Sequence, residues 1–278
     1  MTVASSESAP LIEVKNLVKR YDEKVVLDGF SLTVDRGETC VLIGASGSGK
    51  STFARLLVGL ERPDSGEIWV DGTNIVRLGE RDLDRIRRKF AVVFQKYALL
   101  DSMSVFDNVA FPMHEETDLS DAEIAKRVHL ALRELDVDDA ALKLPGELSG
   151  GMSKRVGIAR AVITDPEILV YDEPTTGLDP ISSRMVDGLI ERMRTGHGVT
   201  SVVITHDMVT AYGIADQVVL LADGKAVAQG TPEELFRSHG KEIEPFAKAS
   251  GVDLARLAFR AKRESPAKIR AQWTRTHP

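Results

Sequence analysis

Cysteine is almost missing from this chain, since its 278 residues include only one, Cys40. A single cysteine excludes an internal disulfide and fits a reducing compartment. Cys40 lies in the apolar run TCVLIG, and we interpret it as a small buried hydrophobic residue. The fold must therefore be stabilised by its core, for which a hydrophobic content of 43% is ample.

Long apolar runs and an excess of positive charge are also missing. The longest apolar runs, such as QVVLLA, have the length of buried strands and fall well short of the ~18–20 residues that span a membrane. The opening MTVASSESAP resembles no secretory signal, so we expect residues 1–10 to form a flexible N-terminal tail. The net charge of −6 argues against a protein that coats nucleic acid. We expect a cytoplasmic protein that reaches a membrane only through a partner.

Strand-like and helix-like segments alternate along most of the chain. Apolar β-rich runs such as TCVLIG, EILVYDEP and TSVVITHD are separated by helical patterns such as STFARLLVGL and SSRMVDGLIERMRT. This alternation predicts an α/β fold with a mainly parallel sheet covered on both faces. Amphipathic helices dominate residues from about 97 to 160, which we predict to be a helical insertion into this α/β core.

The end of the chain changes in charge. Residues 241–278 hold nine basic and four acidic side chains, a net charge of +5 against −11 for the rest. We assign residues 238–278 to a basic C-terminal extension. It is either a solvated helical appendage or a docking element for an acidic partner surface or anionic lipid headgroups.

The motif GASGSGKS, Gly44 to Ser51, fits the phosphate-loop pattern G-x-x-x-x-G-K-[ST]. It directly follows the predicted strand CVLI and precedes the predicted helix STFARLLVGL, which is the context that this motif requires. The glycines let backbone N–H groups turn toward a β-phosphate, and the helix N-terminus adds partial positive charge. Lys50 then supplies a charge at the β- and γ-phosphates, and Ser51 a hydroxyl for Mg²⁺.

Polar side chains follow other apolar strands. EILVYDEP delivers Asp172 and Glu173 at the carboxyl end of a strand, the edge at which open α/β sheets bind ligands. We expect Asp172 to hold Mg²⁺ and Glu173 to polarise the water that attacks the γ-phosphate. His206 ends VVITHD and Gln95 ends AVVFQ. We expect His206 to contact the γ-phosphate or the attacking water, and Gln95 to join Mg²⁺ and that water.

Together these motifs resemble the nucleotide-binding domain of ATP-binding cassette (ABC) transporters, over roughly residues 11–237. Seven motifs occur in the family's order: Tyr21, Gly44–Ser51, Gln95, LSGGM at 148–152, ILVYDE at 168–173, GLDP at 177–180 and His206. The resemblance implies a RecA-like P-loop NTPase fold with an antiparallel β subdomain and the helical subdomain at about 97–160. It also implies ATP hydrolysis, with Tyr21 stacking on adenine. The implied ATP-binding residues are Tyr21, Gly44, Ser46, Gly47, Gly49, Lys50, Ser51 and Thr52; the implied Mg²⁺ ligands are Ser51, Gln95 and Asp172.

The role of the LSGG motif at 148–151 is not evident from a single copy of the chain. LSGG places a serine and two glycines at a predicted helix start, far in sequence from the phosphate loop. In the family resembled, Ser149, Gly150 and Gly151 serve the γ-phosphate held by a second copy, and Asp179 belongs to the D-loop. A serine N-cap and a helix N-terminus suit an anion. We therefore expect a head-to-tail homodimer that sandwiches ATP.

One detail narrows the resemblance. Met152 follows LSGG where many importers have glutamine, and with SVFDNVAFPM this is similar to ATPases of Mla/Mce phospholipid transport. That similarity implies a multi-span permease, and with it an MCE-domain lipid-binding protein, a small accessory cytoplasmic subunit and a peripheral place on the inner membrane. It also implies that DSMSVFDNVAFPM lies where the permease's coupling helix docks, in a groove lined by apolar side chains, namely Met103, Val105, Phe106, Val109 and Phe111. The alternative is that these side chains belong to the core of the helical subdomain, and we expect this of several of them.

Three alternatives stay open from the sequence. The first is the ATPase of an importer for amino acids or other small solutes. The second is a non-transport cassette protein, although long coiled-coil insertions and a second cassette are both missing from the chain. The third is a regulatory subunit that does not hydrolyse ATP, although Glu173, His206 and the signature are intact.

Overall fold

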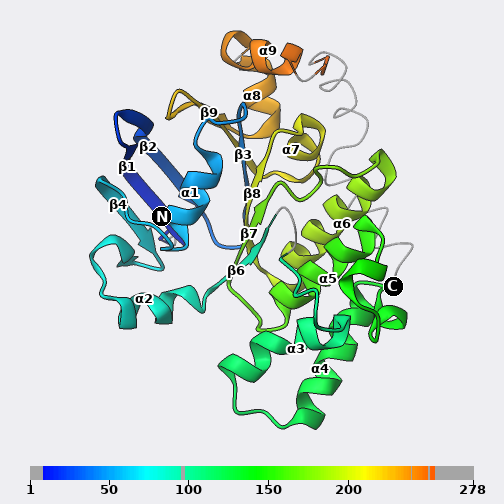
Figure 1. Cartoon of the computed structure of the whole chain (residues 1–278). Coiled ribbons are helices and arrows are strands. Elements are labelled where there is room, and N and C mark those ends of the chain that lie inside the picture. The colour runs from blue at the N-terminus through cyan, green and yellow to red at the C-terminus, as the bar shows by residue number, and fades with distance from the viewer. Residues whose placement is uncertain (1–8, 95–97, 239, 250, 254–278) are drawn as a thin grey trace, which may run out of the picture.

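Two β-sheets and a set of covering helices make up the structure (Figure 1). The computed structural model describes residues 9–94, 98–238, 240–249 and 251–253. The larger sheet has six strands in the order β10-β9-β3-β8-β7-β6, and all neighbours are parallel except β10 and β9. Its strands are β3 (Thr39–Ile43), β6 (Phe90–Val93), β7 (Ile168–Asp172), β8 (Thr200–Thr205), β9 (Gln217–Ala222) and β10 (Lys225–Gly230).

The smaller sheet is antiparallel throughout and has four strands in the order β2-β1-β4-β5. These are β1 (Ile12–Tyr21), β2 (Lys24–Val34), β4 (Ser65–Val70) and β5 (Thr73–Asn74). The predicted α/β fold with an antiparallel β subdomain is confirmed.

Helices fill the connections between strands. The α-helices are α1 (Lys50–Leu57), α2 (Glu80–Arg87), α3 (Val105–Glu116), α4 (Asp121–Glu134), α5 (Gly150–Val162), α6 (Pro180–His197), α7 (Met208–Ile214), α8 (Pro232–Ser238) and α9 (Gly240–Ala249). Short 3₁₀ turns are η1 (Ile75–Arg77), η2 (Asp138–Ala140) and η3 (Pro145–Glu147). None of the helices in the described ranges is long and apolar enough to span a bilayer.

The parallel sheet is buried on both faces, because successive side chains of a strand point to opposite sides. In β7, Ile168 and Val170 join the core beneath the antiparallel sheet and α1, whereas Leu169 and Tyr171 join the core beneath α3 to α6. All four are fully buried. This two-sided burial explains why the strand reads as a continuous apolar run that ends abruptly in two acids.

The helical segment predicted over about 97–160 contains α3, α4 and nearly all of α5, which ends at Val162. Figure 1 shows α3 and α4 beyond one end of the larger sheet and α5 beside its strands. Most of the predicted basic extension lies outside the described residues. Its first part is α9, and Ile243 and Ala247 of α9 are buried in the same core as the helical segment. The predicted boundary between 237 and 238 therefore falls inside α8.

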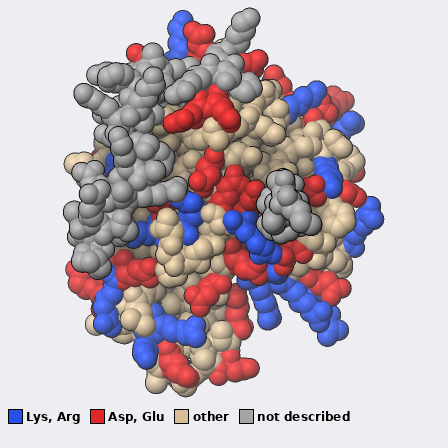
Figure 2. All heavy atoms as spheres, turned by 180° about the vertical axis from the view of Figure 1, so that it is seen from behind, with Lys and Arg blue, Asp and Glu red and all other residues tan. Residues whose placement is uncertain are grey.

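Side chains of both charges occur on the face opposite to that of Figure 1. Figure 2 shows Lys and Arg side chains interspersed with Asp and Glu among the described residues of this face. A polyanion is attracted by a continuous field of one sign, and the described residues of this face form no such field.

Asp187 is a buried carboxylate on α6, and its Arg184 partner lies one turn away at 2.7 Å. Burial raises the pKa of Asp187 to about 6, against the opposing charge of Arg184. Because the folded state then holds this proton more tightly than the unfolded chain, stability falls as pH rises from about 4 to about 6. We expect Asp187→Asn to raise the melting temperature more at about pH 8 than at about pH 5. Thermal unfolding measures this difference. An equal rise in melting temperature at about pH 5 and about pH 8 would show that the buried charge of Asp187 is not the cause of the rise.

Candidate functional site

The loop between β3 and α1 is shaped by its glycines. Gly49, which caps α1, has φ 109°, a value that other residues rarely adopt. A Cβ on Gly44 would lie 2.4 Å from the carbonyl oxygen of Leu221, so this position admits no side chain. Gly47 and Ser46 are exposed at the outer side of the loop, and Thr52 is buried within α1. The loop therefore presents backbone N–H groups and a helix N-terminus at the carboxyl edge of the sheet.

Lys50 lies within this loop and is only 7% exposed. Its Nζ donates hydrogen bonds to the carbonyl oxygens of Gly44 and Ala45, at 2.7 and 2.9 Å. Burial lowers the pKa of Lys50, while the charges of Glu173 and Asp172 act in the opposite direction. The positive charge of Lys50 is thus held near Asp172 and Glu173, at the carboxyl end of β7.

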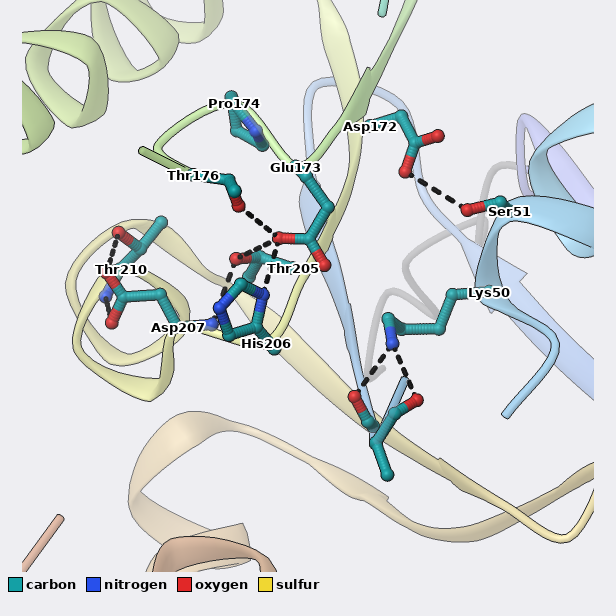
Figure 3. A network of polar contacts seen from close by, with 12 residues as sticks. Lys50, Ser51, Asp172, Glu173, Pro174, Thr176, Thr205, His206, Asp207 and Thr210 are labelled. Atoms are coloured by element: carbon teal, nitrogen blue, oxygen red, sulfur yellow. Dashed lines mark hydrogen bonds and ion pairs between the residues drawn. The ribbon is translucent and has the colours of Figure 1, made fainter. Parts of the chain in front are cut away.

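The two consecutive acids at the carboxyl end of β7 diverge, as Figure 3 shows. Asp172 points toward α1, with its Oδ1 3.4 Å from the hydroxyl of Ser51. Burial, and then the neighbouring charge of Glu173, raise the pKa of Asp172. A carboxylate in this setting gains from a nearby cation. Glu173 turns instead toward β8.

Glu173 is held by three neighbours through one oxygen. Its Oε2 accepts hydrogen bonds from the hydroxyls of Thr176 at 2.8 Å and Thr205 at 3.4 Å, and lies 2.8 Å from Nδ1 of His206. Its backbone has φ 52°, the left-handed region that a non-glycine residue rarely occupies. Strained backbone of this kind persists where its surroundings fix it, and such positions cluster at functional sites.

The structure brings the predicted residues of three strands together. β3, β8 and β7 are neighbours in the sheet, so the phosphate loop, His206 and the two acids meet at one carboxyl edge (Figure 3). Gln95, predicted to belong here, lies outside the described residues. It follows β6, which pairs with β7 at the next position in the sheet.

Tyr21 ends β1 and is 39% exposed. Its hydroxyl donates to Glu61, which also binds Arg55 at 2.5 Å, and Nζ of Lys19 lies 5.0 Å from the ring centroid. The ring is therefore fixed at its polar end and through one cation contact. Its stacking on adenine stays a prediction.

The signature is a capped helix start. Ser149 accepts a hydrogen bond from the N–H of Met152 at 3.3 Å, so it is the N-cap of α5. Ser149 and Gly150 are exposed. Within the described ranges, no hydrogen bond or ion pair links Ser149, Gly150 or Gly151 to the phosphate loop or to Glu173. Asp179 caps α6 by accepting from the N–H groups of Ile181 and Ser182.

The predicted groove residues fall into two groups. Val105 and Val109 are fully buried in the core, so for these two the groove-lining interpretation was wrong and the alternative, a place in the helical core, is confirmed. They face inward because α3 packs on α4 and α5 through that side. Phe111 is 41% exposed, while Met103 and Phe106 are half-buried.

Sequence reasoning missed the residues that surround the predicted ones. Thr176 and Thr205 both bind Glu173, and Arg55 and Glu61 fix Tyr21. Thr205 directly precedes His206 at the end of β8, and this position was the available signal. Nothing in the spacing marks the other three, because their contacts depend on the folded loops.

Comparisons with known proteins agree with this geometry. The family model described as ABC transporter matches residues 27–176. The intermembrane phospholipid transport ATP-binding protein MlaF of Haemophilus influenzae is 39% identical over 252 residues, covering 91% of this chain and 96% of that protein. The methionine import ATP-binding protein MetN of Rhizobium johnstonii is 42% identical over 240 residues, covering 86% of this chain and 65% of that protein.

One of the similar solved structures is a dimer. A dimeric ATP-binding cassette in a post-hydrolysis state, bound to ADP and Pi, superimposes with a TM-score of 0.73 at 30% identity, covering 80% of this chain and 98% of that one. The phosphate loop, the paired acids and the signature at the start of α5 all lie within residues 27–176, which the family model matches. The chain belongs to the ABC transporter family and is the ATP-binding, ATP-hydrolysing subunit of an ABC transporter.

Proposed function

We propose that this chain powers the transport of phospholipid across or between bacterial envelope membranes through a separate permease. The observation that carries the proposal is the match to MlaF over nearly the full length of both chains. MetN is as similar in identity, but this chain spans only 65% of it. Met152 after LSGG supports the same choice, and its side chain packs against the main core at the start of α5.

The site is completed by a second copy of the chain. The exposed N-terminus of α5, with Ser149 as its cap, is an anion-binding feature that its own phosphate loop does not use. In a head-to-tail homodimer, Ser149, Gly150 and Gly151 of one copy face the γ-phosphate held by Lys50 of the other. Asp179 lies at the start of α6 beside this interface. A dimeric cassette among the similar structures supports this assembly.

Mg²⁺ fits the donors present. Among the described residues, no cluster of three or more His, Cys, Asp or Glu side chains forms a metal site on its own. Mg²⁺ usually takes one or two protein oxygens together with substrate phosphates. Ser51 and Asp172 supply two such oxygens side by side, and Gln95 is the third proposed ligand. Bound there, Mg²⁺ neutralises charge on the β- and γ-phosphates.

Glu173 and His206 act on the water. In the proposed mechanism a water lies between Glu173 and the γ-phosphate. The carboxylate's Oε1, which accepts no hydrogen bond from the described residues, polarises it for in-line attack. The contacts of Oε2 with Thr176, Thr205 and His206 fix the carboxylate's direction. Tyr21 holds adenine by stacking.

His206→Ala is expected to lower the ATP turnover number about 10- to 100-fold, because a hydrogen bond to a charged group contributes about 1.5–3 kcal/mol. The KM for ATP should change little, since the phosphate loop is untouched. Steady-state phosphate release measures both. His197→Ala is the matched control, since His197 lies 2.9 Å from Glu134 at the exposed end of α6. A turnover number equal to that of the His197 variant would exclude a role for His206.

The proposed partners follow from this assignment. Two copies of the chain close on two Mg·ATP and reopen after hydrolysis, and this movement drives the permease. The proposed assembly holds the chain on the cytoplasmic side of the inner membrane, with an MCE-domain lipid-binding protein and a small accessory cytoplasmic subunit.

Affinity purification from native membranes solubilised in detergent tests the substrate. We expect tagged chain to bring down a multi-span permease, an MCE-domain protein and phospholipid, identified by mass spectrometry. Recovery of a solute permease with a soluble binding protein would contradict phospholipid transport and leave the ATPase assignment intact.

The second candidate is the ATPase of an importer of amino acids or other small solutes. The 42% identity to MetN favours it. Stimulation of ATP turnover by a reconstituted permease and an amino acid, rather than by phospholipid, would establish it.

A further inference from the structure

Lys154 is a buried charge that the proposed mechanism does not use. It lies on α5, and the residue is 1% exposed. Its Nζ donates hydrogen bonds to the carbonyl oxygens of Pro174 at 2.6 Å and Thr176 at 3.0 Å. Burying an ammonium group is costly unless it is paired and hydrogen-bonded. A side chain placed there at such a cost requires an explanation beyond packing.

The partners of Lys154 form the turn that follows Glu173. Thr176 closes this turn from the other side, because its hydroxyl donates to Oε2 of Glu173 at 2.8 Å and its N–H to the carbonyl oxygen of Glu173 at 3.3 Å. Glu173 itself has φ 52°. The turn is therefore a strained segment that is held from two sides. Lys154 of α5 binds its carbonyl oxygens, and the carboxylate of Glu173 binds the hydroxyl of Thr176.

The same helix begins at the signature. Lys154 lies little more than one turn after Ser149, the N-cap of α5. At the helix start, a Cβ on Gly150 would lie 3.9 Å from Leu178, and one on Gly151 3.9 Å from Ser182. Leu178 and Ser182 flank Asp179. The segment from Glu173 to Asp179 is thus hydrogen-bonded to α5 through Lys154, and its other end lies close to the start of α5.

The charges of Lys154 and Glu173 also interact. Burial lowers the pKa of Lys154 to about 8, and the charge of Glu173 acts in the opposite direction. The charge of Glu173 thus favours the ammonium form of Lys154.

We propose that Lys154 is a positioning residue for ATP hydrolysis, which fixes the turn behind Glu173 and so links the carboxylate of one nucleotide site to the signature helix that serves the other. This inference rests on the proposed two-copy site. When the N-terminus of α5 docks on the partner's γ-phosphate, its Lys154 carries the displacement to its own Glu173. The two sites of the dimer then turn over cooperatively.

Lys154→Met tests the proposal, because methionine keeps an unbranched side chain and removes the charge and the donors. We expect the turnover number to fall about 10²-fold, since small misplacements of a reacting group cost that much. The KM for ATP should change less than about threefold, and cooperativity in ATP should be lost. Lys154→Arg restores a donor and a charge, and it should recover part of the turnover and the cooperativity. Lys126→Met, at an exposed position of α4, is the matched control.

A merely structural lysine gives a different pattern. Turnover would then fall only in proportion to the folded fraction, cooperativity would be unchanged, and this result would overturn the proposal. If Lys154→Met does not fold, Thr176→Val loosens the same turn from the other side, and wild-type turnover and cooperativity in that variant would also overturn it. Glu173→Gln in the same assay separates the two failures. If Glu173→Gln stays active, the proposed site has failed; if only the Lys154 variants behave as wild type, this inference alone has failed.

Discussion

Replacing Glu173 with glutamine is expected to lower ATP turnover by about 10²- to 10⁴-fold, the usual contribution of a positioned general base. Glutamine keeps the shape of the side chain and an oxygen for Thr176 and His206, so the turn should survive. It loses the carboxylate that polarises water. ATP binding, which depends on Lys50 and the loop at the other side of the site, should be retained.

Two measurements check this result. Phosphate release gives the loss of turnover, and gel filtration with ATP should show the Glu173→Gln variant as a stable dimer because ATP is bound but not consumed. Glu167→Gln is the control, since Glu167 directly precedes β7 at its opposite end and pairs with Lys89 at 3.0 Å on the surface. If the Glu173 variant turns over as fast as the Glu167 variant, Glu173 is not the base.

Lys50→Ala is expected to weaken ATP binding by about 10- to 100-fold, because a charge-assisted hydrogen bond contributes about 1.5–3 kcal/mol. Turnover should fall further, by about 10²- to 10³-fold, since removing a donor aimed at developing charge has that effect. Lys50 is suited to both roles because its ammonium is held by two loop carbonyls beside Asp172 and Glu173.

Binding of a fluorescent ATP analogue and phosphate release separate the two effects. Lys24→Ala, at an exposed position of β2, serves as the control. Thermal unfolding shows whether the loop has lost its structure, as the two carbonyl contacts are lost with the side chain. Unchanged affinity and turnover in a folded Lys50 variant would contradict the assignment of this loop.

Local patterns made the elements of the site predictable. A loop that requires φ 109° at Gly49 and no Cβ at Gly44 can be built by few sequences, so the motif predicts its own conformation. The apolar run of β7 predicts a strand buried on both faces, and its end predicts where Asp172 and Glu173 emerge. Ser149 was expected at a helix start and is the N-cap of α5.

What depends on tertiary contacts was not predictable. Lys154 is a charged residue in a helical pattern, and nothing in its spacing predicts burial against two carbonyl oxygens 20 and 22 residues away in sequence. The sequence left open which apolar side chains of 101–113 line a groove and which join the helical core, and the packing of α3 places Val105 and Val109 in the core. The left-handed backbone at Glu173 was not predictable either, because such a conformation is expected at glycine or asparagine and this residue is a glutamate.

Cross-linking between two variants, each with one introduced cysteine, tests the shared nucleotide site most directly. Ser46→Cys places a thiol on the exposed side of the phosphate loop, and Ser149→Cys places one at the signature. The native Cys40 is fully buried and does not compete. Both variants carry Glu173→Gln, so that ATP holds the dimer closed, and they are mixed with a short bis-maleimide reagent.

We expect a cross-linked pair in the mixture with Mg·ATP, little without nucleotide, and little in either variant alone. That pattern requires the phosphate loop of one copy to face the signature of the other. If the mixture with ATP gives no more cross-linked product than either variant alone, the two motifs do not meet across a dimer, and the account of the site is wrong.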